Sequence, residues 1–262
     1  TPLYSSAASD VYKRQLEAGL RSFHWLQPFP EEIDRMITSR LANIHFCPNE
    51  WSENNLSNII QEKVITQGNT LIDSLNRVLK DNPKNVLPSE VRNKPYFLFA
   101  LHRQENLIDP DFVRKIIALL VKKSRKITCV FILHEPTRVV LEELGLFEEL
   151  KNNKNVYLSP RIPYIQFMKV VQNSKFLVSD GGSNQEECFY FGLPFLILRN
   201  YTERIEGLGE NAVLSKKNFS VISDFFKNVE MYRKPPYTPA VSPSRMVAEI
   251  LAQKLSEKAI WK

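Results

Sequence analysis

The sequence has little of what marks membrane-spanning, secreted or zinc-binding proteins. No uninterrupted apolar run approaches the roughly 20 residues that a membrane helix needs, and no apolar core of a secretory signal is visible. The three cysteines, Cys47, Cys129 and Cys188, are widely spaced and form no CxxC pair. These absences argue against a disulfide framework or a zinc site and predict a reducing compartment, with the cytoplasm as the expected location.

The chain also lacks the signatures of several enzyme classes. It contains no H-E-x-x-H metal motif, no Walker lysine, no G-x-S-x-G elbow and no complete G-x-G-x-x-G. The reactions that depend on these motifs are therefore disfavoured.

What the chain does contain is an ordinary globular composition with an excess of positive charge. Its 262 residues are 43% hydrophobic and 24% charged, which suits one large domain or two ordinary ones. The net charge of +6 suits an anionic partner, but the basic residues are scattered and no basic stretch is interleaved with aromatics. A solvated basic surface is the simpler explanation, and nothing specific supports nucleic-acid binding.

The first part of the chain has a mixed character. Residues 1–15 show neither helical nor strand periodicity and do not resemble the start of a domain. Pro30-Glu31-Glu32 predicts a helix start, because proline suits the first turn and acidic side chains favour its positive end. Strands are predicted at 44–47 and 63–66 and a helix at 70–79, and residues 81–94, with two prolines, are interpreted as an interdomain linker.

From residue 96 onward, short β-rich runs alternate with helical patterns, which predicts a parallel sheet with helices on both faces. The predicted strands are 96–101, 128–133, 155–158, 176–179 and 195–198, and the predicted helices are 111–123, 137–144, 164–172, 185–191, 218–229 and 244–257.

Polar residues follow five consecutive predicted strands. Because ligands bind beyond the carboxyl ends of the strands in open parallel sheets, this recurrence predicts one ligand site. The segments are His102-Arg103-Gln104-Glu105, His134-Glu135, Ser159-Pro160-Arg161, the turn from Asp180 to Glu187, and Arg199 with Thr202-Glu203-Arg204.

The turn Asp180-Gly181-Gly182-Ser183 is the most informative of these segments. Two glycines let the backbone approach a ligand closely, and N–H groups at the following helix start attract phosphate. Glu187 lies one turn into that helix, where a carboxylate suits a ribose diol. The simpler alternative is an ordinary left-handed turn with a capping arrangement, but with its neighbours the turn favours a nucleotide diphosphate.

The histidines differ in context. His102 leaves its strand beside Arg103 and is a candidate for contacting phosphate, and His134 repeats that position on the next strand. His24 and His45 have no such context, and we expect them at the surface and in the core respectively.

The earlier segment supplies candidate acid and base groups. Two carboxylates in a cleft, such as Glu17 and Glu31, can divide proton removal and donation. Arg35 follows Glu31 by one helical turn. The alternative is a capping glutamate and an ordinary i,i+4 ion pair, and spacing alone favours that alternative.

Six motifs together resemble the UDP-N-acetylglucosamine 2-epimerase family, in an order and spacing that fit from Leu16 to about Leu214. They are Glu17-Ala18-Gly19-Leu20-Arg21, Pro30-Glu31-Glu32-x-x-Arg35, Gln67-Gly68-Asn69-Thr70-x-x-Asp73, His102-Arg103-x-Glu105-Asn106, Asp180-Gly181-Gly182-Ser183-x-Gln185-Glu186-Glu187 and Thr202-Glu203-Arg204-x-Glu206.

The resemblance implies an α/β, GT-B-like fold, in which two Rossmann-like domains face each other across a cleft. On that basis we expect a non-family or artefactual segment at 1–15 and the tail of an incomplete N-terminal Rossmann-like domain at 16–82. A C-terminal UDP-binding Rossmann-like domain is expected at 95–235, followed by a helix at 236–262 that crosses back to the first domain. The family has about a hundred further residues before the Glu17 motif, so the chain is expected to be a fragment.

The resemblance also implies a reaction and a set of residue roles. The reaction interconverts UDP-GlcNAc and UDP-ManNAc by elimination and re-addition of UDP, with no metal, no nicotinamide or other cofactor and no membrane partner, in a parent that forms a homodimer. The implied catalytic residues are Glu17, Glu31 and His102, the implied substrate-binding residues are Arg35, Arg161, Gly181, Gly182, Ser183 and Glu187, and the implied second-site residues are Arg103, Glu105 and His134.

Two alternatives stay open. Arg103, Glu105 and His134 favour the non-hydrolysing branch. The first alternative is the hydrolysing branch, whose reaction releases UDP and free N-acetylmannosamine. The second alternative is a UDP-binding domain that catalyses no reaction. One departure bears on binding, because family members commonly have Asp-Ser-Gly-Gly where this chain has Asp180-Gly181-Gly182-Ser183, so a hydroxyl donor has moved.

Overall fold

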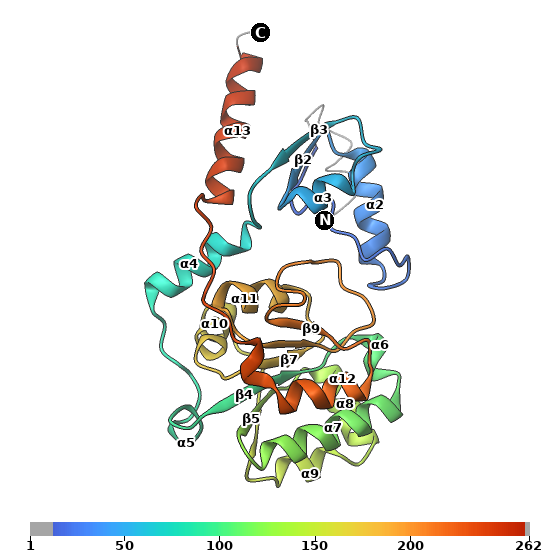
Figure 1. The fold of residues 1–262 in the computed structure, drawn as a ribbon, viewed down its shortest axis with the longest axis vertical. Coiled ribbons are helices and arrows are strands. Elements are labelled where there is room, and N and C mark those ends of the chain that lie inside the picture. The colour runs from blue at the N-terminus through green and yellow to red at the C-terminus, as the bar shows by residue number, and fades with distance from the viewer. Residues whose placement is uncertain (1–12, 260–262) are drawn as a thin grey trace. The chain divides into compact units, whose positions relative to one another are not determined.

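The computed structural model describes residues 13–259 and divides into two compact units (Figure 1). Unit 2 is Ser74–Thr238, and unit 1 contains the described residues up to Asp73 and from Pro239 onward. The expectation of non-family sequence at residues 1–15 falls, for residues 1–12, outside the described residues.

Unit 2 is built on a six-stranded parallel sheet in the spatial order β6-β5-β4-β7-β8-β9. All five pairings are parallel, as the alternation of strands and helices predicts. The last strand was not predicted, because its three residues carry too little pattern. The strands are β4 (Tyr96–Ala100), β5 (Thr128–Ile132), β6 (Val156–Ser159), β7 (Leu177–Ser179), β8 (Phe195–Ile197) and β9 (Ala212–Leu214).

Helices cover both faces of this sheet, which confirms the predicted α/β class (Figure 1). Helices α7, α8, α9 and α12 lie on one face, and α10 and α11 lie on the other. The helices and turns of unit 2 are α5 (Ser89–Arg92), α6 (Gln104–Leu107), α7 (Pro110–Ser124), α8 (Glu135–Glu143), α9 (Phe147–Lys151), α10 (Tyr164–Gln172), α11 (Ser183–Phe191), α12 (Phe219–Lys227) and the 3-10 turn η1 (Val229–Tyr232).

The centre of the unit 2 core is aromatic. Strand β4 is buried along its whole length, and Phe97 stacks on Phe176 with ring centroids 4.7 Å apart. Phe99 meets Phe131 edge to face, also at 4.7 Å. Each buried aromatic side chain stabilises the fold by about 1.5–3 kcal/mol, so β4 is anchored firmly between its neighbours.

Unit 1 has a smaller parallel sheet in the order β1-β2-β3. Its C-terminal helix packs Val247 against Ile44 and Phe46, and the carboxylate of Asp73 accepts the backbone N–H of Ser244 at 2.8 Å, which caps that helix. The elements are β1 (Arg14–Gln15), α2 (Glu31–Leu41), β2 (Ile44–Cys47), α3 (Glu50–Asn54), β3 (Glu62–Ile65) and α13 (Pro243–Ala259), and the compact units divide within α4 (Leu71–Asp81).

Two segments differ from their expected character. Gln15 pairs with β2 despite its polarity, because its side-chain oxygen lies 3.1 Å from both His45 Nδ1 and the Ser39 hydroxyl. His45 is fully buried, as expected. Residues 81–94, interpreted as a linker, include the buried side chains of Leu87 and Val91.

Candidate functional site

The order of the strands in unit 2 determines where a ligand site can form. In chain order the six strands lie 3-2-1-4-5-6 across the sheet, and the order reverses between β4 and β7. A crevice opens at the carboxyl ends of the two strands at such a switch point. His102 follows β4 and Asp180 follows β7, so the sheet brings together two segments that are far apart in the sequence.

Asp180 connects the ends of the two strands at this switch point. Its carboxylate is fully buried and accepts the backbone N–H groups of His102 at 3.1 Å and Arg103 at 2.9 Å, and the side-chain amide of Asn106 at 2.9 Å. His102 Nδ1 lies 2.9 Å from Asp180 Oδ1. Burial by itself raises the pKa of Asp180, but the contacts with His102, Arg103 and Asn106 outweigh burial and hold that pKa below its ordinary value.

The two candidate histidines lie face to face. The rings of His102 and His134 stack with centroids 4.7 Å apart and planes 16° apart. Burial, together with the positive charges of His102 and Arg161, lowers the pKa of His134 to about 4. His134 is therefore neutral near pH 7, and its ring offers a flat surface and a hydrogen-bonding nitrogen rather than a charge.

A cavity of about 270 Å³ opens beside these histidines. It brings together five of the predicted site residues, namely His102, His134, Arg161, Ser183 and Glu187. Apolar side chains of Ile132, Ile162 and Phe167 complete much of the wall. A cavity with apolar walls and a few convergent polar groups is the usual form of a small-molecule site.

Arg103 and Glu105 are placed differently from the other candidates. Neither is among the residues that line the cavity of about 270 Å³. The backbone of Arg103 is used to hold Asp180, and the carbonyl of Glu105 accepts a hydrogen bond from Lys217 Nζ at 3.2 Å.

The glycine turn has a helical backbone rather than a left-handed one. Gly182 has φ −68° and ψ −46°, and neither Gly181 nor Gly182 is among the glycines with positive φ. The alternative of an ordinary left-handed turn is therefore wrong. Space favours glycine at position 182 instead, because a Cβ there would lie 2.7 Å from Oε1 of the buried Glu203.

The start of α11 has no side-chain cap. Gly182 occupies the N-cap position, and no side chain caps the helix there. Because the first N–H groups of a helix have no partner within it and carry partial positive charge, this end suits an anion. The exposed side chain of Ser183 adds a hydroxyl at the same end.

Glu187 lies on the first turns of α11 and is 1% exposed. Asn184 Nδ2 donates to Glu187 Oε2 at 2.8 Å, and Tyr164, which also lines the cavity, makes a second side-chain hydrogen bond. Burial raises the pKa of Glu187, and Asn184, Arg204 and Tyr164 partly oppose the rise. The result is a fixed hydrogen-bond acceptor at the wall of the cavity.

Beneath the glycine turn lies a buried network of four charged side chains. Arg204 Nη1 contacts Glu186 Oε1, and Arg199 Nη2 lies 3.0 Å from Glu203 Oε2. All four side chains are nearly inaccessible, and their two positive and two negative charges balance. Removing one member leaves an uncompensated buried charge, so each member is expected to matter for the stability of unit 2.

The candidate residues of unit 1 are less buried. Glu17 has a left-handed φ of 52°, and its Oε1 accepts the side-chain amide of Asn69 at 2.6 Å. Glu31 begins α2, and Arg35 Nη1 lies 3.3 Å from the buried Glu32 Oε2. Glu17, Glu31 and Arg35 are each partly exposed.

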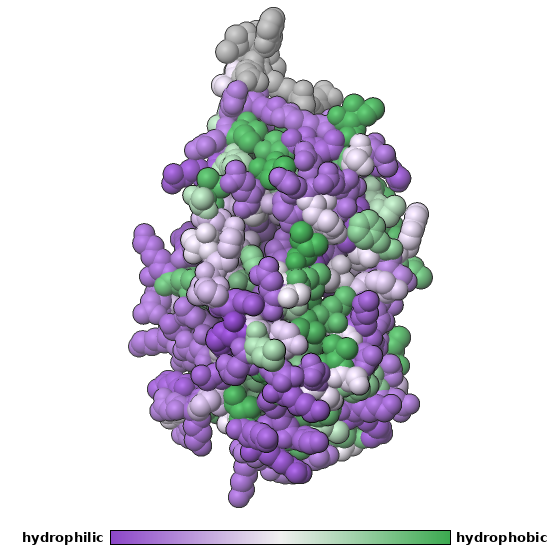
Figure 2. Space-filling view, viewed as in Figure 1, coloured by the Kyte–Doolittle hydropathy of each residue, from purple (hydrophilic) through white to green (hydrophobic). Residues whose placement is uncertain are grey.

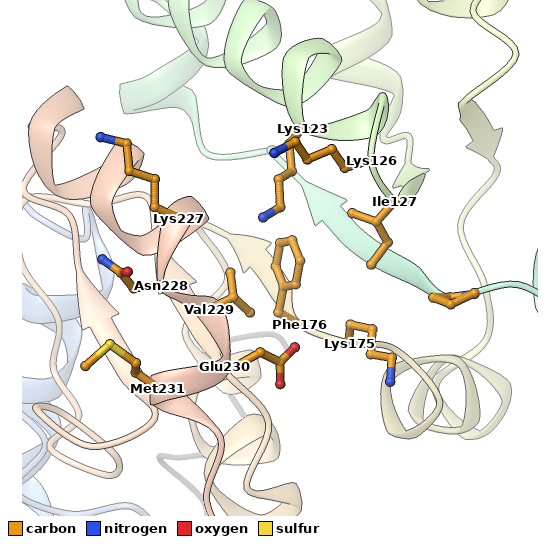
Figure 3. Close-up of a pocket in the computed structure, with 11 residues that line it drawn as sticks. Lys123, Lys126, Ile127, Lys175, Phe176, Lys227, Asn228, Val229, Glu230 and Met231 are labelled. Atoms are coloured by element: carbon orange, nitrogen blue, oxygen red, sulfur yellow. The ribbon is translucent and has the colours of Figure 1, made fainter.

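A larger cavity of about 490 Å³ lies at the opposite end of the unit 2 strands (Figure 3). Phe176, directly before β7, forms part of its wall, and the rim carries lysines. Lys123 Nζ donates to the Phe226 carbonyl and lies 5.5 Å from the centroid of the Phe176 ring, so its charge is already engaged within unit 2. None of the predicted site residues lines this cavity. The lysines are Lys123, Lys126, Lys175 and Lys227.

Sequence reasoning missed several residues that shape the site. Asp180 and Asn106 were present in the motifs, but no role was predicted for either. Their signal was weak because both act through contacts between segments more than 70 residues apart. Tyr164 and Asn184 gave no signal, since a tyrosine and an asparagine near helix starts are common.

Residues 13–259 contain neither a candidate metal site nor a candidate membrane span. No group of three or more His, Cys, Asp or Glu side chains is arranged to hold a metal ion. No helix among these residues combines the length and apolar character needed to cross a membrane.

The family is shown by comparison with known proteins. Residues 14–245 match the family model described as UDP-N-acetylglucosamine 2-epimerase. The chain belongs to the UDP-N-acetylglucosamine 2-epimerase family. It is 30% identical over 245 residues to the UDP-N-acetylglucosamine 2-epimerase of Methanocaldococcus jannaschii, and the match covers 88% of this chain and 66% of that relative. The chain thus spans just under two thirds of the length of this curated relative.

Solved structures agree with this family assignment. The Methanocaldococcus jannaschii UDP-GlcNAc 2-epimerase in complex with UDP-GlcNAc and UDP aligns with a TM-score of 0.77 and 29% identity, over 95% of this chain and 71% of that one. The Neisseria meningitidis enzyme bound to UDP-GlcNAc aligns with a TM-score of 0.79 and 28% identity, over 95% and 71%. The expected family and the α/β class with parallel sheets are confirmed.

Proposed function

We propose that this chain provides the UDP-binding part of a non-hydrolysing UDP-GlcNAc 2-epimerase. The observation that carries the proposal is the convergence of His102, Arg161, Ser183 and Glu187 on one cavity at the switch point. This arrangement supplies the contacts a nucleoside diphosphate needs. The uncapped start of α11 suits the diphosphate, and the Glu187 carboxylate suits a ribose diol.

The glycine turn and its neighbours have distinct roles in this proposal. Gly181 and Gly182 let the diphosphate approach the backbone, and Ser183 donates a hydroxyl. Arg161 contributes positive charge from the turn after β6. His102 contacts the diphosphate and stabilises UDP as it leaves.

The proposed reaction is elimination followed by re-addition. A carboxylate removes the proton from C2 of the sugar, the C1–O bond breaks, and its electron pair leaves with UDP, so that a C1–C2 double bond remains. In the return step C2 takes a proton on the opposite face and UDP rebinds C1. Glu17 and Glu31 are the groups proposed to move these protons, and Arg35 is proposed to bind the substrate.

Arg103, Glu105 and His134 are proposed to bind a second, activating substrate molecule, which would place the protein in the non-hydrolysing branch. Support comes from the stack of His134 on His102, which brings a second-site candidate into contact with a catalytic candidate. A relative whose structure holds both UDP-GlcNAc and UDP adds support.

We further propose a cytoplasmic location and a homodimeric full-length parent. The three cysteines are buried free thiols, which suits a reducing compartment. Light scattering of a full-length relative tests the dimer, and a monomeric mass at micromolar concentration would refute it.

Product analysis tests the reaction. Purified chain is incubated with UDP-GlcNAc in deuterated water, and the products are followed by NMR. Because the chain spans just under two thirds of its relative's length, we expect UDP binding with little or no turnover. Any product formed should be UDP-ManNAc carrying deuterium at C2. Free N-acetylmannosamine released in step with UDP would instead assign the hydrolysing branch, and UDP binding with no turnover in the full-length parent would leave a non-catalytic UDP-binding protein.

A further inference from the structure

Asn184 lies on the first turn of α11 and makes hydrogen bonds at both ends of its side-chain amide. Its Nδ2 donates to Glu187 Oε2 at 2.8 Å, and its Oδ1 accepts the hydroxyl of Ser179 at 3.2 Å. Ser179 ends β7 and is fully buried, whereas Asn184 is half-buried and lines the cavity of about 270 Å³. The amide therefore connects a buried residue of the sheet to the carboxylate at the cavity wall.

These contacts continue into the glycine turn. The Ser179 hydroxyl also accepts the backbone N–H of Gly181 at 3.0 Å. A Cβ at Gly181 would lie 2.4 Å from Asn184 Oδ1, so the amide oxygen lies in space that the missing side chain leaves. One chain of hydrogen bonds thus runs from the backbone of the glycine turn through Ser179 and Asn184 to Glu187.

Donors and acceptors match at every step of this chain. The Ser179 oxygen accepts the Gly181 N–H, and its own proton is directed to Asn184 Oδ1. With Oδ1 accepting, Nδ2 faces Glu187, whose ionised carboxylate only accepts. A flipped amide would turn an oxygen toward the carboxylate, so the Ser179 hydroxyl favours the orientation that serves Glu187.

We infer that Asn184 is a positioning residue that holds the Glu187 carboxylate by its Oε2 in the orientation that accepts the ribose hydroxyls of a bound nucleotide. The inference rests on the proposed UDP site for the identity of the ligand. That Asn184 holds the carboxylate follows from the contacts within unit 2.

A held carboxylate still has room for a ligand. A carboxylate offers about four lone-pair sites, so its contacts with protein donors leave sites for ribose hydroxyls. A glutamate side chain that nothing holds loses rotamer freedom when a ligand orders it, and this loss weakens binding. The titratable or charged groups that face Glu187 are Tyr164 on α10, Arg204 after β8 and, across the cavity, His102, His134 and Arg161.

A leucine at position 184 separates positioning from the filling of space. Asn184→Leu keeps nearly the same shape and removes both polar ends of the amide. The matched control is Asn152→Leu, which removes an amide from an exposed position at the end of α9.

The first test needs no ligand. The side-chain carboxyl of Glu187 is followed by ¹³C NMR in the full 262-residue chain as the pH is lowered, and its signal is assigned by its absence in Glu187→Gln. Because Asn184 donates to the ionised form, we expect Asn184→Leu to shift the Glu187 titration to higher pH and Asn152→Leu to leave it unchanged. Equal titrations in all three proteins would overturn the inference.

The wild type alone supplies a second measurement, which does not depend on the folding of any variant. The side-chain NH₂ signals of Asn184 should shift at the pH at which Glu187 takes up its proton, since the acceptor loses its charge there. Signals that do not respond would overturn the inference. Failure of the chain to bind UDP would refute the proposed function and leave these two results in place.

Calorimetry with UDP and 2′-deoxy-UDP tests the role toward the ribose. We expect the wild type and Asn152→Leu to bind UDP roughly tenfold more tightly than 2′-deoxy-UDP, since one hydrogen bond to a charged group is lost. Asn184→Leu should reduce this preference to about threefold or less, because the carboxylate is no longer held. An equal loss of affinity for both ligands would indicate general damage to the cavity and would contradict a positioning role, and so would the absence of the preference in the wild type.

Discussion

The two compact units differ in how deeply they bury the carboxylates of their proposed sites. In unit 2, Asp180, Glu186 and Glu187 are at most 1% exposed and are bonded to other residues of the same unit. In unit 1, Glu17 and Glu31 are partly exposed. The difference is one of burial: the carboxylates around the proposed nucleotide site are enclosed by unit 2, whereas Glu17 and Glu31 have partly exposed side chains, and Glu17 is held by the Asn69 amide.

Unit 1 also carries a short segment of exposed apolar side chains. Hydrophobic residues reach the surface in several places on the face shown in Figure 2. The largest exposed apolar side chains of unit 1 include Phe23, Trp25, Leu26 and Phe29, each more than 60% exposed within one short segment. An exposed apolar cluster of this kind marks a contact surface or a tendency to self-associate.

Breaking the buried network of unit 2 should have the largest effect. We expect Glu186→Ala to lower the free energy of unfolding by about 3–5 kcal/mol, because it removes the carboxylate that contacts the buried Arg204 and leaves the charges of the network unbalanced. Chemical denaturation followed by circular dichroism measures the loss. The control is Glu142→Ala, which removes an exposed ion pair with Arg138 and should cost at most about 1 kcal/mol. Equal losses for the two variants would refute a preorganised turn.

Lowering the pH should reduce the folding stability of unit 2, because His134 takes up a proton more readily in the unfolded chain. Its pKa falls from 6.5 to about 4 on folding, so the unfolded chain binds more protons between these pH values and stability rises with pH across that window. The stabilisation is complete above pH 6.5 and is lost as the pH falls towards 4. We expect His134→Phe, which preserves a ring for stacking, to reduce the change in the free energy of unfolding across this pH window by about 1–2 kcal/mol. An unchanged slope in urea denaturation across this window would contradict the pKa direction.

Asp180 acts in a lower pH window. Its pKa is depressed on folding, so its contribution is present above the ordinary value of 3.8 and is lost as the pH falls through the lowered value. The His134 and Asp180 windows therefore separate, which allows the two groups to be tested in one titration.

Replacing the exposed apolar side chains of unit 1 should have a smaller effect, which is confined to self-association. We expect the double variant Phe23→Ser/Trp25→Ser to reduce self-association in sedimentation velocity, and to leave UDP affinity within about twofold. Met231→Ser, which changes a 75% exposed side chain of unit 2, is the matched control. Self-association that persists unchanged in the double variant would show that this segment is not the contact surface.

Much of unit 2 was predictable from local pattern. All five strands predicted from residue 96 onward form, and α10 begins and ends at the predicted residues. The predicted site residues His102, His134 and Glu187 line one cavity. Their proximity could be predicted because the rule that ligands meet the carboxyl ends of parallel strands needs only strand positions.

The remainder depends on contacts that a linear pattern does not encode. The strand order places β4 beside β7, and only that order gives Asp180 its partners. The glycines at 181 and 182 were explained by close approach of a ligand to the backbone, and the structure adds a second reason at Gly182, where a Cβ would lie 2.7 Å from Oε1 of the buried Glu203. The strand β1 was missed because Gln15 is polar, and its pairing depends on His45 and Ser39.

The central claim is that unit 2 binds UDP at the switch point between β4 and β7, and UDP calorimetry tests it most directly. The measurement compares the wild-type chain with Glu187→Gln and with Glu143→Gln, an exposed glutamate on α8. The account predicts saturable UDP binding by the wild type and by Glu143→Gln, and roughly tenfold weaker binding by Glu187→Gln, since a charge-assisted hydrogen bond is lost. No binding by the wild type, or equal affinity for all three proteins, would contradict it.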